Sequence, residues 1–138
     1  MAEVEIIDVD PDGEVILICG CDETDHSSDP SSDTRSKKTI KICVRAIVLT
    51  LNSPVFKALL SPRFKEGSEL AANFTAEIPL PDDEGYAMHA LCQVLHLRNK
   101  SFSDSMPYDE LLKIANLADK YDCTEAVMHA AELWMYGL

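Results

Sequence analysis

Hydrophobic positions change their spacing within residues 40–60, and the change predicts a strand followed by two short helices. Apolar side chains first alternate with Lys, Cys and Arg, and a period of two is typical of a half-buried strand. From Val48 to Leu51 they recur at helical spacing instead, until Ser53 and Pro54 interrupt them. A serine can cap a helix and a proline fits its first turn, so a second helix is expected up to residue 60. Two helices this apolar cannot both face water, so we expect them to form the middle of the core.

The rest of the chain predicts two more strands and three more helices. Residues 14–19, EVILIC, form a nearly continuous apolar run that is typical of a buried strand, and residues 75–80 predict a third short strand. Helical spacing of apolar residues predicts helices over 83–96, 107–121 and 124–136. Because the strands come first and the helices later, we expect an α+β fold with three strands and about five helices.

Two polar segments set the expected domain boundaries. Residues 1–13 are acidic and show no helical periodicity, so we expect an N-terminal segment ahead of one domain over residues 14–136. Residues 22–38 are rich in Ser and Asp and carry no side chain that could anchor them in a core. They therefore predict a disordered loop, inserted between the first two strands of the domain.

The charge of the chain excludes two classes of partner. Its 138 residues include 12 Lys and Arg against 24 Asp and Glu, so the net charge at pH 7 is −12. Nucleic acid and anionic membrane surfaces both require clustered positive charge, so we expect neither as a partner. The chain opens without a charged and apolar leader and has no run of 18 apolar residues. These features predict a protein of the cytoplasm or the nucleus.

Cysteines and histidines are the candidates for metal or redox chemistry. The chain has five cysteines, and an odd number in apolar surroundings favours free thiols. Cys19 and Cys21 could hold a soft metal together with His26, but no second cysteine pair stands at zinc-ligand spacing. Free thiols at the end of a strand are therefore the favoured interpretation.

A second candidate lies on the helix predicted over residues 83–96. His89, Cys92 and His96 fall on one helical face, which would suit a metal or redox site. Such a site needs further ligands and supporting hydrogen bonds, so a face used for packing or partner contact is favoured. We therefore predict no catalytic, cofactor-binding or metal-ligating residue and expect a protein that is not an enzyme. A metal-dependent or thiol-based enzyme is the alternative, and elemental analysis would separate the two.

Several motifs taken together resemble the BTB/POZ domain, and most closely its fungal branch. In that family a strand leads into a helix pair with a Leu…Ser-Pro-x-Phe pattern. The matching stretches, in family order, are VRAIVLTLNSPVFKALL (44–60), FKEG (64–67), IPLPDD (78–83), LLKIA (111–115) and ADKYDC (118–123). The resemblance covers residues 13 to about 134. It implies the BTB/POZ fold, a small three-stranded sheet capped by about five α-helices that include two helical hairpins.

The resemblance implies a protein-interaction module. BTB domains self-associate, bind transcriptional cofactors, or dock cullin scaffolds of ubiquitin ligases as adaptors, so the expected partners are proteins: a cullin or a second copy of this chain. Cullin-docking members carry a hydrophobic-x-Glu signature just after the helix pair, where this chain has Phe64-Lys65-Glu66. The partner-binding residues implied are Leu60, Phe64, Lys65, Glu66, His89 and Tyr108. Two alternatives remain: Phe64 packs the link onto the core, or the domain homo-oligomerises or binds a transcriptional cofactor without a cullin.

Overall fold

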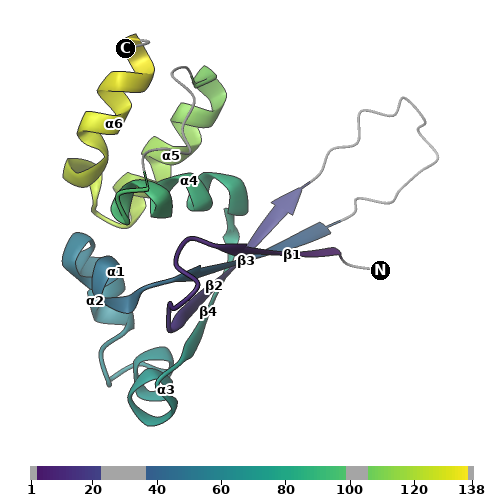
Figure 1. Cartoon of the computed structure of the whole chain (residues 1–138), viewed down its shortest axis with the longest axis vertical. Helices are drawn as coiled ribbons and strands as arrows, with labels where there is room; N and C mark the ends of the chain where they lie inside the picture. Colours follow the sequence, from purple (N-terminus) through teal and green to yellow (C-terminus); the bar gives the residue numbers. More distant parts are fainter. Residues whose placement is uncertain (1–2, 23–36, 99–105, 137–138) are drawn as a thin grey trace.

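The computed structural model describes residues 3–22, 37–98 and 106–136, which form an α+β fold with a four-stranded mixed sheet and six helices (Figure 1). The elements in chain order are β1 (Glu3–Asp8), β2 (Val15–Asp22), β3 (Lys37–Val44), α1 (Ala46–Asn52), α2 (Pro54–Leu59), α3 (Lys65–Asn73), β4 (Ala76–Glu84), α4 (Gly85–Leu95), α5 (Tyr108–Lys120) and α6 (Thr124–Tyr136). The α+β class predicted from the sequence is confirmed. Among the described residues, no helix is long and apolar enough to cross a lipid bilayer.

The sheet mixes strand directions in the order β1-β3-β2-β4. The strands β2 and β3 form an antiparallel pair, while β1 runs parallel to β3 and β4 runs parallel to β2. The register places Ile7, Ile42, Leu17 and Ile78 side by side in one row across the four strands. Side chains alternate between the two faces of a sheet, so this row identifies the face that carries the core.

This inner face of the sheet is buried beneath α4. Most inward residues of β2, β3 and β4 are buried, while Cys21, Lys38 and Leu80, toward one end of the strands, are half-buried. The buried residues are Val15, Leu17, Cys19, Ile40, Ile42, Val44, Ala76 and Ile78. Helix α4 packs against β2 and β3, and α5 and α6 pack on α4 in turn (Figure 1). The helix begins so close to the sheet that a Cβ at Gly85 would lie 2.6 Å from Cδ1 of Ile40. Glycine is needed there because any side chain would push α4 off the sheet.

The predicted break between α1 and α2 is confirmed at Ser53 and Pro54. The Ser53 hydroxyl accepts a hydrogen bond of 3.1 Å from the backbone N–H of Phe56, and Pro54 occupies the first helical position. The same hydroxyl donates to the carbonyl of Tyr121 at 2.5 Å. One side chain therefore caps α2 and ties it to the turn between α5 and α6.

The number of strands and helices differs from the prediction of three and about five. No strand was predicted within the acidic segment 1–13, yet β1 pairs with β3 and packs Ile7 against the core. Helix α3 follows α2, where the sequence predicted no helix. Its glycine, Gly67, is buried so closely on Ser61 that a Cβ would lie 1.9 Å from the Ser61 carbonyl oxygen. Here glycine marks close packing of a helix instead of a turn.

The predicted loop over residues 22–38 is shorter at both ends than expected. The strand β2 extends to Asp22 and β3 begins at Lys37, where the two residues lie opposite each other. Residues 23–36 lie outside the described residues, so the prediction of disorder there stays a prediction.

Candidate functional site

The start of α3 presents the tripeptide that the sequence singles out. Phe64 is the N-cap residue of α3 with 48% of its side chain exposed, Lys65 is exposed, and Glu66 is half-buried in the first helical turn. The Phe64 backbone N–H donates to the Ser61 carbonyl at 3.1 Å, which closes the turn after α2. A carboxylate in the first turn also favours the helix, because it faces the positive end of the helix dipole.

Leu60 belongs to the core instead of this surface. Only 8% of its side chain is exposed, and it lies within the central hydrophobic cluster. A partner protein would reach it only after the helix pair repacked. The structure therefore gives Leu60 a packing role and leaves Phe64 as the exposed apolar side chain after α2.

His89 and Tyr108 lie on other parts of the molecule. His89 is half-buried on α4, and Tyr108 begins α5 with 75% of its side chain exposed. In Figure 1, α3 lies at the opposite end of the molecule from α5 and α6, and its main contact is with β4. The structure brings Phe64, Lys65 and Glu66 together, but it does not gather His89 and Tyr108 around them.

The helix pair exposes two apolar side chains of α1, one of which, Leu51, the sequence interpretation placed in the core. Leu51 is 78% exposed and Ile47 is 59% exposed on α1, while Leu49 between them is fully buried. Ile47 and Leu51 are spaced four residues apart, so they lie on one helical face. The core assignment of Leu51 was therefore wrong, because the short helix α1 buries one side and turns the other to solvent.

The predicted His89, Cys92 and His96 face divides into separate environments. Cys92 is completely buried, while His96 at the end of α4 hydrogen-bonds to the residue just before α1. The His96 Nε2 accepts a hydrogen bond of 3.1 Å from the Arg45 backbone N–H, and its Nδ1 donates to the Cys92 carbonyl at 2.8 Å. This pattern fixes the neutral imidazole. Within the described part of the chain, no group of three His, Cys, Asp or Glu side chains is placed to hold a metal ion.

Charged side chains near His96 add further contacts at the start of α1. Arg45 pairs with Asp10 at 2.6 Å through its Nε, and this pairing lowers the pKa of the Asp10 carboxyl. The Glu14 carboxylate accepts a hydrogen bond of 2.5 Å from the Ala46 backbone N–H and so caps α1. The turn between β1 and β2 is thereby fastened to the helix pair.

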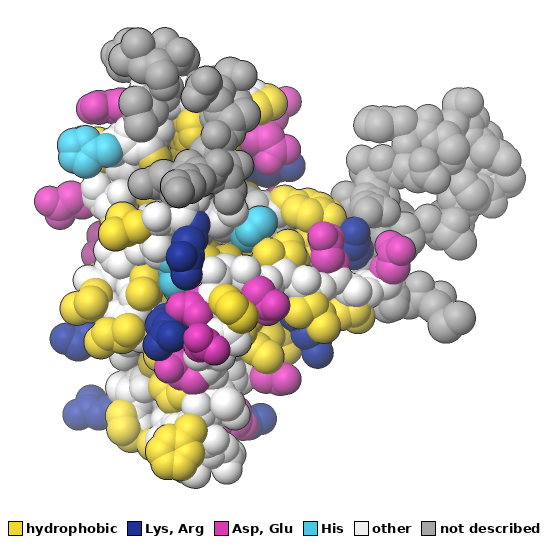
Figure 2. Space-filling model, viewed as in Figure 1, with side chains coloured by type: hydrophobic (Ala, Val, Ile, Leu, Met, Phe, Trp, Pro, Cys, Tyr) yellow, Lys and Arg dark blue, Asp and Glu magenta, His cyan; other side chains and the backbone are white. Residues whose placement is uncertain are grey.

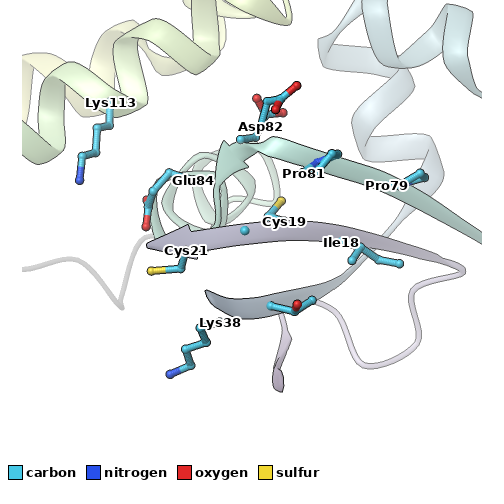
Figure 3. A pocket seen from close by; sticks show the side chains of 12 residues that line it. Ile18, Cys19, Cys21, Lys38, Pro79, Pro81, Asp82, Glu84 and Lys113 are labelled. Carbon is cyan, nitrogen blue, oxygen red and sulfur yellow. The ribbon is translucent and has the colours of Figure 1, made fainter. Parts of the chain in front are cut away.

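An open hollow of about 740 Å³ lies at the far end of β2 and β4 (Figure 3). Figure 3 shows Lys113 of α5 and Lys38 of β3 on either side of it, with Glu84 between them. Burial raises the pKa of the Cys19 thiol at its wall to about 12. A thiol with this pKa is neutral at pH 7 and is a poor nucleophile.

The other buried thiols behave in the same way. Burial raises the pKa of Cys123 to about 11, and it raises the pKa of Cys92 as well. No buried side-chain nitrogen or oxygen in the described residues lacks a hydrogen-bond partner.

Neither a scan against protein-family models nor a search of curated proteins finds a match to this chain.

Proposed function

We propose that this protein is a BTB-type interaction module, and not an enzyme, which docks a cullin scaffold through Phe64, Lys65 and Glu66. The observation that carries the proposal is the exposure of the Phe64 ring beside Glu66, directly after the helix pair. The order of elements supports it: a β2–β3 pair leads into α1 and α2, and a second helix pair packs on α4. This order is the one that the sequence motifs imply.

The chemistry of the tripeptide suits a docking contact. An exposed aromatic ring buries a large apolar area at a low entropic cost, which is why aromatic side chains dominate the energy of many interfaces. Glu66 next to it supplies a hydrogen-bond acceptor for the rim of the contact. The backbone of Phe64 is held by its bond to Ser61, so little ordering is needed on binding.

The substitutions Phe64→Ala and Glu66→Lys test the docking surface directly. We expect each to weaken binding of a purified cullin N-terminal domain at least tenfold by calorimetry. Phe64→Ala removes the apolar ring from the contact, and Glu66→Lys removes its hydrogen-bond acceptor. The urea midpoint should change little for Phe64→Ala, since Phe64 is 48% exposed. Glu66→Lys should lower the midpoint slightly, because it removes the half-buried carboxylate that favours the first turn of α3.

Matched controls lie on the same helix. Phe74→Ala removes an 80% exposed ring at the other end of α3, and Glu69→Lys reverses a charge between the two ends. Both controls should bind the cullin domain as wild type does. If Phe64→Ala and Glu66→Lys also bind as wild type, this surface is not the docking site.

Self-association through the helix pair is the second candidate function. The observation that favours it is the exposed aliphatic pair of Ile47 and Leu51 on α1. Burial of two such side chains against a partner copy would remove from water an apolar area that the monomer leaves open.

A further inference from the structure

The face of the sheet that points away from α4, here called the outer face, is left open by the part of the chain that the structure describes. Side chains on it include Val4, Ile6 and Asp8 of β1, Thr39, Lys41 and Cys43 of β3, Ile16 and Ile18 of β2, and Glu77 and Pro79 of β4. All of these are exposed or half-buried, whereas most inward residues of β2, β3 and β4 are buried. One face of the sheet therefore packs on the core while the other meets solvent.

The outer face is more apolar than a solvated face should be. Ile6 is 72% exposed and Val4 is 53% exposed, and Figure 2 shows hydrophobic side chains gathered along β1. Beyond Thr39 and Lys41 of β3, the half-buried Ile16 and Ile18 stand on β2. Sheets with one wet face normally alternate apolar with polar residues, while a continuous apolar strand is typical of a sheet covered on both sides. Exposed apolar side chains such as Val4 and Ile6 on an open sheet face are typical of an interaction site.

The charges on this face form a pattern that can match itself. Lys41 lies between Ile6 and Ile18 in one cross-strand row, while Asp8 and Glu77 lie at the two ends of the next row. Lys41 forms no ion pair within the described residues. Among the side chains that the structure describes on this face, Lys41 is thus a cation without an ion pair, close to the exposed carboxylates of Asp8 and Glu77.

We propose that a second copy of this chain covers the outer face, so that two sheets pack face to face around a twofold axis. In such an isologous contact each Lys41 can approach Asp8 or Glu77 of the other copy. By composition, residues 23–36 offer this face no apolar side chain beyond a single proline. A strongly basic partner would gain little electrostatic attraction here, because Lys41 in the middle of the face would repel it.

The size of the face predicts a weak dimer. Four strands about 4.8 Å apart and about six residues long, at about 3.3 Å per residue, cover roughly 400 Å² per copy. Stable interfaces bury about 800 Å² on each side. We therefore expect dissociation constants in the micromolar range or weaker.

Analytical ultracentrifugation from 5 to 500 µM tests the proposal. Wild type should dimerise over this range, and Ile6→Lys, which changes a mostly exposed residue, should weaken the dimer at least tenfold. Lys41→Glu should weaken it as well, and a second change, Glu77→Lys or Asp8→Lys, should restore it in the double variant. A monomer at every concentration, or no restoration by either double variant, overturns the proposal.

Control variants separate this interface from the function proposed above, on which it does not depend. Leu51→Lys on α1 and Phe64→Ala before α3 should leave the dimer unchanged. Ile6→Lys should retain cullin binding if the docking proposal holds, so either idea can fail alone. If Leu51→Lys abolishes dimerisation while Ile6→Lys does not, the helix pair is the interface and the outer face is not.

Discussion

Tyr121 connects three elements through a single residue. Its ring stacks on Phe56 with the ring centroids 4.4 Å apart, and its carbonyl accepts from the Ser53 hydroxyl. Its own hydroxyl donates to Asp83, whose side chain is only 3% exposed and also accepts from Lys120 at 2.6 Å. Burial raises the pKa of Tyr121 above its ordinary value, so the hydroxyl stays protonated and donates a hydrogen bond to Asp83.

The change Tyr121→Phe should therefore destabilise the protein by about 1–3 kcal/mol, because it leaves a buried carboxylate oxygen without a donor. Urea unfolding followed by circular dichroism measures the loss. Tyr108→Phe is the matched control, since that ring is 75% exposed, and it should leave the midpoint unchanged. Equal midpoints for both variants would mean that Lys120 alone satisfies Asp83.

Residues with local partners were predictable from the sequence, and residues with distant partners were not. Ser53 and Pro54 predict the start of α2 because a capping side chain hydrogen-bonds within its own helix. Nothing adjacent in the sequence indicates that Asp83 is buried, since its partners Lys120 and Tyr121 lie in another helix and the turn after it. Phe64 was identified as a surface candidate from its motif, and its exposure depends on how α3 folds back.

At the scale of elements, the contact between α4 and α1 depends on a neutral histidine. His96 accepts the Arg45 backbone N–H, which a protonated ring could not do. Burial lowers the pKa of His96 and of His89 below the ordinary value of 6.5. The unfolded chain then binds more protons than the folded one at slightly acidic pH.

Above about pH 6.5 we expect the contribution of the two histidines to the free energy of unfolding to be constant. Below pH 6.5 the unfolded chain binds protons first, so the free energy of unfolding should fall until the pH reaches the lowered pKa values of the folded protein. Urea midpoints measured from pH 7.5 to 5.5 should show this slope. His96→Gln should flatten it, while His129→Gln on the exposed side of α6 should not. A slope that is the same in all three proteins would assign the effect to other groups.

Two elements were not predicted from the sequence, and each has a physical reason. The strand β1 is short and acidic, and it exists because β3 offers it a pairing edge. The helix α3 contains a glycine that sequence rules interpret as a turn, yet Gly67 allows the helix to touch the Ser61 backbone. In both cases tertiary contact overrides local propensity.

At the scale of the whole molecule, the β2–β3 pair can be tested by shortening its connection. Asp22 and Lys37 are cross-strand neighbours, so Asn-Gly in place of residues 23–36 should form a two-residue turn. The shorter loop should raise the free energy of unfolding by about 1–2 kcal/mol, because less chain entropy is lost on folding. Thermal and urea unfolding measure the change.

A glycine–serine segment of the original length is the control for this replacement and should match wild type in stability. If the Asn-Gly variant unfolds or loses stability, residues 23–36 make contacts that the fold requires. Such a result would overturn the interpretation of this segment as a spacer.

The parallel pairing of β1 with β3 has a consequence for the order of events on the ribosome. The strand β1 is synthesised before β3 and pairs with Lys38 to Cys43 across its whole length, so it must wait until these later residues have emerged. Until then its aliphatic side chains have no docking place in the nascent chain. Folding of the N-terminal end is therefore a late event that follows synthesis of the β2–β3 pair, and a chaperone that holds short extended segments has time to act on it.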